Sequence, residues 1–270
     1  MVFNIVTIFP EMIKEYLRFG IVSTALKKGI FDVNVVNLRD FSTSKNGDGR
    51  IDDGIFGHGK GMLFRPEPLY EAVKAVKKKY PGSRVVYLTP RGKKFDNVAA
   101  RRLSEEESLV LICARYEGVD ARFVLTSVDE EISIGDYVLT GGELPALVVL
   151  DAVTRMLEGS IKNDSREEES FEYGLLEYDH YTEPGVFSGL IVPDELKSGD
   201  HKKLEKLRFE SSLKKTYNNR IDLLLNYKPA FNPGETADPL KKMMRKNREL
   251  KNFLLIIQNI SKEWKDGRRN

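Results

Sequence analysis

Apolar residues in the first half of the chain gather in short runs, separated by stretches whose composition suits helices. Five runs have the length and the β-branched content of buried strands: residues 2–9, 31–36, 84–88, 109–113 and 128–133. The helical stretches between them are residues 11–28, 67–80 and 97–103. Because strands alternate with helices, the pattern predicts an α/β fold, with a mostly parallel sheet covered by helices on both faces.

The segment 143–157 is apolar on almost every side of a helix, and Pro145 stands near its start, where helices tolerate proline. A helix of this kind must be buried on more than one side. A second copy of the chain is one candidate for part of that cover.

The pattern changes after residue 158. Residues 158–188 are polar and acidic and show no periodicity, and so long a loop is usually functional or mobile. Asp200 then predicts the cap of a basic helix, and helical spacing returns near residues 239–260. We therefore predict an α/β domain (1–157), a flexible interdomain linker (158–190) and a small basic helical domain (191–270).

Charge divides along the same boundary. Residues 1–190 carry 24 Lys and Arg against 30 Asp and Glu, whereas residues 191–270 carry 19 against 11. The net charges of −6 and +8 favour a polyanionic partner that is bound mainly by the C-terminal part. A solvated helical surface explains the charge equally well at this point.

Composition excludes several classes of protein. The longest apolar run, 144–150, is far shorter than the ~20 residues of a membrane span, and no basic segment precedes residues 2–9 as in a signal peptide. The single Cys113 forms no internal disulfide, which suits a cytoplasmic location. With only three scattered histidines, the chain has no zinc-ligand spacing, and we expect no metal site in it.

Three loops follow predicted strands at their C-terminal ends, where open α/β sheets bind ligands. They are residues 87–92, 113–120 and 132–143. Any one of them is typical of a tight turn, but three after successive strands predict a shared pocket. The segment 54–61 nearly matches a phosphate-binding loop, yet Gly61 stands where that loop needs Ser or Thr. No G-x-G-x-x-G follows a strand, so a dinucleotide site of that type is not expected either.

A series of motifs closely resembles the bacterial tRNA (guanine-N1)-methyltransferases, which modify the guanosine 3′-adjacent to the anticodon. The order and spacing of the motifs carry the resemblance, which runs to about Tyr217. They are residues 7–12 (TIFPEM), 37–40 (NLRD), 50–53 (RIDD), 59–62 (GKGM), 115–120 (RYEGVD), 132–145, 170–171, 174–177 (GLLE) and 180–184 (HYTEP).

The resemblance implies a trefoil knot in the α/β domain, where S-adenosylmethionine lies bent, and a homodimer whose subunits share the active site. It implies that the divalent ion Mg²⁺ can take part. The cofactor-binding residues it indicates are Tyr87, Leu88, Thr89, Pro90, Ala114, Tyr116, Glu117, Gly118, Ile134, Gly135, Asp136, Tyr137, Val138, Leu139, Gly141, Gly142 and Pro145.

Methylation at guanine N1 needs a base for the N1 proton and a cation for the charge that grows on O6. By resemblance, the base is Glu169, where the family usually has aspartate, and the cation is Arg155. Glu168 is an alternative base. Glu117 resembles the family's guanine-contacting carboxylate. The remaining expected contacts to tRNA are Gly59, Ser170, Lys202, Lys203, Lys206, Arg208, Lys214 and Lys215.

Two other functions remain open at this point. One is a related knotted methyltransferase that acts on a ribose 2′-hydroxyl or on rRNA, for which Arg155 and the acidic linker would be incidental. The other is an RNA-binding protein without catalytic activity.

Overall fold

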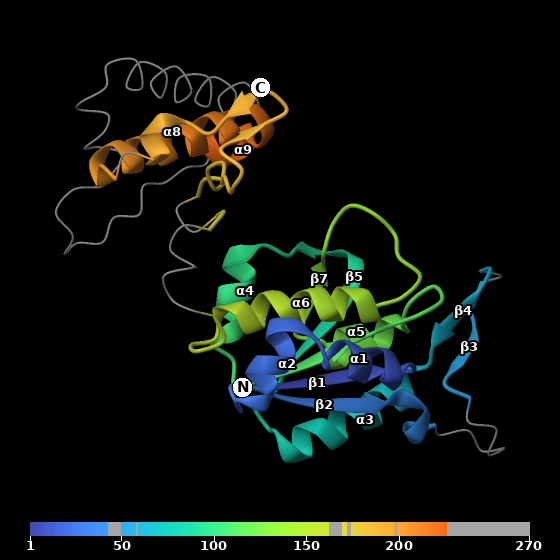
Figure 1. Cartoon of the computed structure of the whole chain (residues 1–270). Helices are drawn as coiled ribbons and strands as arrows, with labels where there is room; N and C mark the ends of the chain where they lie inside the picture. Colours follow the sequence, from blue (N-terminus) through green and yellow to red (C-terminus); the bar gives the residue numbers. More distant parts are fainter. Residues whose placement is uncertain (43–49, 58, 162–168, 172–173, 198, 226–270) are drawn as a thin grey trace, which may run out of the picture. The chain divides into compact units, whose positions relative to one another are not determined.

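The computed structural model describes residues 1–42, 50–57, 59–161, 169–171, 174–197 and 199–225 (Figure 1). The chain divides into two compact units, Met1–Lys162 and Asn163–Asn270, and each is described here by itself. The helix predicted near residues 239–260 lies outside the described residues. In the ranges given above, none of the helices combines the length and the apolar character that crossing a membrane requires.

A five-stranded sheet, parallel throughout, forms the centre of the first unit, as the strand pattern predicts. Its order is β2-β1-β6-β5-β7. The strands are β1 (Val2–Thr7), β2 (Asp32–Asn37), β5 (Arg84–Lys94), β6 (Ser108–Ile112) and β7 (Glu130–Ser133). All five residues of β6 are buried, because this strand lies in the middle of a sheet that is covered on both faces.

Helices cover both faces of this sheet (Figure 1). One core includes Phe3 and Leu111 and packs against α1 (Pro10–Tyr16), α2 (Gly20–Lys27), α4 (Asn97–Ser104) and α6 (Glu143–Met156). The other includes Val6 and Ile112 and packs against the 3-10 helix η1 (Leu38–Phe41), α3 (Pro66–Lys79) and α5 (Ala121–Ser127). Neighbouring strand residues thus serve opposite cores, as the two-residue period of a strand requires.

Three details differ from the sequence-based prediction. Residues 11–28 form two helices, because the chain turns at Gly20, whose φ is +67°. Helix α5 was not predicted; the Asp120 carboxylate caps it by accepting a hydrogen bond from the Arg122 amide at 2.8 Å. The hairpin of β3 (Asp52–Gly54) and β4 (Met62–Phe64) was not predicted either.

Helix α6 is buried on several sides, as predicted, but not on all. Its inner residues pack against the sheet and against α4, whereas Leu144 is 51% exposed and Val148 is 45% exposed. These two side chains are four residues apart and so lie on one side of the helix. An apolar stripe on α6 therefore faces away from the core of its own unit.

Strand β5 leaves the sheet as an arch and then returns to it. Leu88 and Lys93 both pair with Ile132 of β7, so the residues between them stand outside the ladder. The arch closes through Gly92, where an added Cβ would lie 2.4 Å from the Ile132 nitrogen. Only glycine permits this close approach.

The second unit contains a short hairpin and the predicted basic helix. Its described elements are β8 (Val186–Phe187), β9 (Leu190–Ile191), a 3-10 helix η2 (Asp194–Lys197), α8 (His201–Asn219) and α9 (Ile221–Leu225). The predicted cap is confirmed, because the Asp200 carboxylate accepts a hydrogen bond from the Lys203 amide at 3.3 Å.

The arch gives a test of the first unit's packing. Replacing Gly92 with Ala should lower the free energy of unfolding by roughly 1–3 kcal/mol, because the methyl group would press on the backbone of β7. Urea unfolding followed by circular dichroism measures this change. Gly82→Ala is the control, since nothing lies within 4 Å of a Cβ added there. Equal stability of the two variants would contradict the arch geometry.

Candidate active site

A pocket of about 480 Å³ opens in the first unit, where β5, β6 and β7 end. The three loops singled out in the sequence line it together. Sixteen of the seventeen residues expected to bind the cofactor are among the lining residues, and exposed Asp136 is the exception. The other lining residues are Leu63, Arg91, Arg115, Val119, Ala121, Ile132, Ser133 and Thr140.

Direct backbone contacts join two of these loops. The Gly142 amide donates a hydrogen bond to the Ala114 carbonyl at 2.8 Å, and Arg115 forms an antiparallel bridge with Gly141. A Cβ on Gly142 would lie 2.7 Å from the Cα of Cys113, so a larger residue would push the loops apart. Strand β5 lies between β6 and β7 in the sheet, yet the loops that follow β6 and β7 touch.

A buried carboxylate beside the pocket holds three segments together. Glu143 is 1% exposed; it accepts a hydrogen bond from the Thr7 hydroxyl at 2.8 Å and one from Arg115 Nε at 2.9 Å. The Arg115 guanidinium also lies over the Phe9 ring, 4.6 Å from its centroid. Glu143 is in the first turn of α6, where the helix dipole favours a negative charge.

This network was missed in the sequence. Thr7 and Arg115 both lie in motifs that carry the resemblance, but no spacing indicated that they meet at Glu143. The network also affects Cys113, whose thiol pKa is raised well above its usual value by burial, with the Glu143 charge adding to the effect.

Two tyrosines of the pocket differ in exposure. Tyr87 is buried, and burial raises the pKa of its hydroxyl. Tyr116 is half exposed and has a left-handed backbone, with φ of +57°. Such strain in a residue other than glycine is concentrated at functional sites. Its ring meets the Phe64 ring edge-on at 5.7 Å, which links the pocket to β4.

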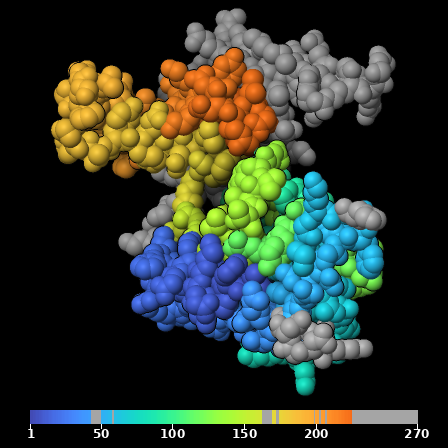
Figure 2. Space-filling view, turned by 90° about the vertical axis from the view of Figure 1, so that its right-hand side faces the viewer, coloured from blue at the N-terminus to red at the C-terminus, as the bar shows by residue number. Residues whose placement is uncertain are grey.

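The hairpin of β3 and β4 lies against the Glu117 side of the pocket. The Glu117 amide donates a hydrogen bond to the Met62 carbonyl at 3.0 Å, and a Cβ on Gly61 would lie 2.6 Å from Glu117 Cγ. Figure 2 shows the light-blue hairpin at the surface beside the green loop segments. Exposed Gly59 is in the turn of this hairpin, so Gly59 and Glu117, two of the expected substrate contacts, belong to adjoining segments.

The two residues expected to carry the chemistry belong to different units. Arg155 lies in the last turn of α6, and Glu169 lies in the second unit, immediately before Ser170. Glu168 is outside the described residues. Each residue is therefore placed within its own unit only.

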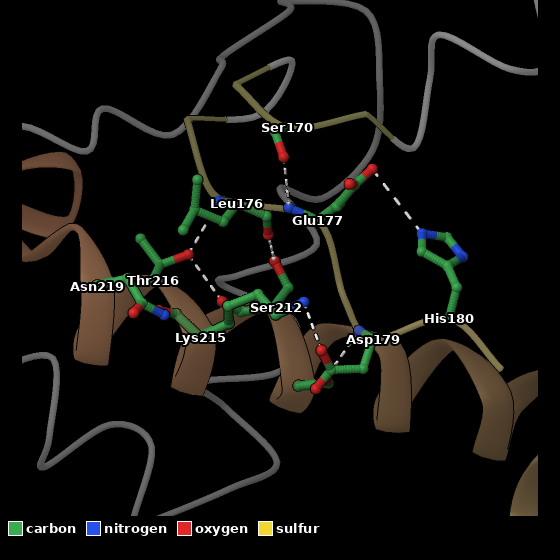
Figure 3. A network of polar contacts seen from close by, with 10 residues as sticks. Ser170, Leu176, Glu177, Asp179, His180, Ser212, Lys215, Thr216 and Asn219 are labelled. Carbon is green, nitrogen blue, oxygen red and sulfur yellow. Dashed lines mark hydrogen bonds and ion pairs between the residues drawn. The ribbon is translucent and has the colours of Figure 1, made fainter. Parts of the chain in front are cut away.

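In the second unit, residues 176–179 lie along α8, and side-chain hydroxyls of that helix hold them there (Figure 3). Thr216 Oγ1 accepts a hydrogen bond from the Leu176 amide at 2.9 Å, and the Ser212 hydroxyl donates to the Leu176 carbonyl. The Ser170 hydroxyl, expected to contact substrate, accepts a hydrogen bond from the Glu177 amide at 3.0 Å.

Acidic partners already bind some of the cations expected to contact tRNA. Lys215 pairs with Asp179 and holds the pKa of that carboxyl below its usual value. Lys203 pairs with Asp200 at 3.5 Å, Arg208 lies over the Tyr178 ring at 4.9 Å, and Lys214 is exposed. Lys202 and Lys206 are in α8, but their side chains lie outside the described part of the chain.

Among the residues that the structure describes, no three His, Cys, Asp or Glu side chains are grouped closely enough to hold a metal ion. We therefore assign no chemical step to Mg²⁺.

Comparison with known proteins decides the family. The model of the family described as "tRNA (Guanine-1)-methyltransferase TrmD" matches residues 1–226. The chain belongs to this family. A tRNA (guanine-N(1)-)-methyltransferase of Thermosipho melanesiensis is 47% identical over 83% of this chain and 89% of its own length. One from Clostridioides difficile is 45% identical over 82% of this chain and 96% of its own length.

The fold of the chain is similar to that of a solved structure, the tRNA (m1G37) methyltransferase from Aquifex aeolicus. The TM-score is 0.67 at 40% identity, over 80% of this chain and 93% of that chain. The family match ends at residue 226, so the C-terminal residues 227–270 lie beyond it.

The buried carboxylate gives the second test. Glu143→Gln should lower the free energy of unfolding by about 2–4 kcal/mol, because Arg115 loses its charged partner in a mostly buried place. Urea unfolding measures the loss. The control is Glu130→Gln, whose pair with Arg102 at 2.7 Å is more exposed and should be worth about 1 kcal/mol or less. Similar losses in both variants would refute the anchoring role of Glu143.

Proposed function

We propose that this chain transfers a methyl group from S-adenosylmethionine to N1 of the guanosine at position 37 of tRNA, 3′-adjacent to the anticodon. The observation that carries the proposal is the family match over residues 1–226, which includes all three pocket loops. The names of the relatives and of the solved structure agree with this reaction.

The pocket suits S-adenosylmethionine in size and in chemistry. Its volume of about 480 Å³ is in the range of small-molecule sites, which usually combine apolar walls with a few polar groups. Leu88, Ile134 and Pro145 offer apolar surface for a flat base, and glycine-rich backbone offers hydrogen-bonding groups. When bound there, the cofactor supplies an electrophilic methyl group on a sulfonium.

We also infer that the loops form the trefoil knot of the family. The support is the contact of Gly142 with Ala114, because the chain must pass the end of β5 to make it. Glu143, which directly follows Gly142, accepts a hydrogen bond from Thr7 and so connects this loop to β1.

The roles of the reacting groups follow from the chemistry of guanine. N1 carries a proton, and its electron pair becomes a nucleophile only as that proton leaves. In the proposed reaction Glu169 accepts the proton, Arg155 stabilises the negative charge that grows on O6, and Glu117 contacts the base. N1 then forms a bond to the methyl carbon while the bond from carbon to sulfur breaks.

The length of α6 supports the homodimer that we propose for this chain. Pro145 lines the pocket, and Arg155 is ten residues further along the helix, roughly 15 Å at 1.5 Å per residue. An arginine side chain is too short to return over that distance. In the proposed homodimer, Arg155 of one subunit serves the pocket of the other, and the exposed Leu144 and Val148 offer an apolar contact for the partner.

The second unit supplies the RNA contact in this proposal. Helix α8 carries the lysines expected to neutralise phosphates, of which Lys214 is exposed. Phosphate contacts position an RNA but do not identify a base, so recognition of guanine falls to the pocket region and to Glu117.

We propose that the reaction takes place in the cytoplasm. The support is the free, buried thiol of Cys113, because a reducing compartment keeps thiols unpaired.

Methylation of defined transcripts tests the function. A tRNA transcript with guanine at position 37 should accept a methyl group from labelled S-adenosylmethionine, and the same transcript with adenine there should accept none. Mapping the product should place the methyl group on N1. A methyl group on a ribose 2′-hydroxyl, or binding of RNA without transfer, would support one of the two other functions instead.

Single substitutions test the proposed base. Glu169→Ala should lower the single-turnover rate by roughly 10²- to 10⁴-fold, the usual contribution of a general base. Glu168→Ala is the matched control and should keep nearly the full rate. The reverse result would transfer the role to Glu168, and full activity in both variants would end the assignment.

A further inference from the structure

Helices α1 and α6 are joined by a hydrogen bond that the reaction described above does not use. The hydroxyl of Tyr16, the last residue of α1, donates to Asp151 Oδ2 at 2.7 Å. Both side chains are partly buried. Asp151 lies in the second half of α6, away from the pocket end of the helix.

The Tyr16 phenol remains a proton donor at any ordinary pH. Burial raises its pKa to about 12, with further contributions from the hydrogen bond to Asp151 and from the charge of that carboxylate. A hydrogen bond to a charged group is stronger than one between neutral groups and is more exacting in geometry. Tyr16 therefore fixes the position of the Asp151 carboxylate relative to α1.

Asp151 precedes Arg155 by four residues, one turn of α6. Side chains at this spacing meet on one face of a helix, and an acidic residue on the N-terminal side of a basic one is the favourable order. The Tyr16 hydroxyl donates its hydrogen bond to Oδ2 of Asp151, so Tyr16 does not occupy the other carboxylate oxygen, Oδ1. Asp151, held by Tyr16, thus lies one turn of α6 before Arg155, on the same face of the helix.

We propose that Tyr16 and Asp151 are positioning residues for Arg155, which they hold in the orientation that the transition state requires. This inference rests on the role of Arg155 in the proposed function. A long arginine side chain samples many rotamers, and a cation stabilises a growing charge on O6 only if its direction is set beforehand. The carboxylate supplies that direction, and Tyr16 keeps the carboxylate in place.

The first experiment compares Tyr16→Phe with Tyr70→Phe in the full-length protein. Both changes remove one hydroxyl and keep the ring; Tyr70 is 51% exposed on α3, which packs on the opposite face of the sheet. Tyr16→Phe should lower kcat roughly tenfold through misplacement of Arg155, with KM for tRNA and for S-adenosylmethionine unchanged. Tyr70→Phe should change neither constant.

A second variant guards against a folding defect. Asp151→Asn keeps an acceptor for the Tyr16 hydroxyl but removes the charge that Arg155 needs, so it should lower kcat at a nearly unchanged melting temperature. In an Arg155→Ala background, measured in single turnovers, neither change should lower the rate further, because nothing is left to position.

Each outcome has a distinct meaning. Wild-type kcat in Tyr16→Phe and in Asp151→Asn, with Arg155→Ala inactive, overturns this inference and leaves the proposed function intact. Equal losses with and without Arg155 also overturn it, because they show a general structural effect. Full activity of Arg155→Ala would instead show that the reaction does not need this cation. That result would overturn the role of Arg155 in the proposed function, and this inference with it.

Discussion

The arrangement of the first unit depends on one buried charge. A carboxylate that is 1% exposed is very costly unless it is paired, and Glu143 is paired with groups from two distant parts of the chain. Thr7 comes from the end of the first strand and Arg115 from the loop after β6. Satisfying Glu143 therefore requires both segments to end beside the start of α6. Arg115 also lines the pocket, so its bond to Glu143 fixes one part of the pocket wall.

Helix α6 connects this pocket to the proposed chemistry. It begins at the buried carboxylate and ends near Arg155, so one rigid element determines both the wall of the ligand site and the place of the cation. The exposed Leu144 and Val148 and the bond from Tyr16 to Asp151 lie along one face of the same helix. In the proposed dimer, the geometry of each active site is consequently set by the packing of two copies of α6.

The sequence pattern predicts the sheet well, because buried parallel strands and amphipathic helices leave clear periods. Helix α5 was not predicted because it is only seven residues long. Residues 11–28 have the composition of one continuous helix, although the chain turns at Gly20. The pocket loops are predictable from their place after strands, and sixteen of the seventeen cofactor-binding residues that the resemblance indicates line the pocket. The bonds of Glu143 and the contact of Gly142 with Ala114 are not predictable in this way, because contacts between distant segments leave no periodic trace.

The hydroxyl contacts along α8 have a consequence for the timing of the proposed reaction. Glu169 is followed directly by Ser170, which binds the Glu177 amide, and the segment beyond it is fastened to α8 by Ser212 and Thr216. The proposed base and the helix proposed to grip RNA thus belong to one body. An RNA that does not bind α8 would therefore not bring the carboxylate of Glu169 to the guanine. Removal of the N1 proton would then depend on RNA binding to α8.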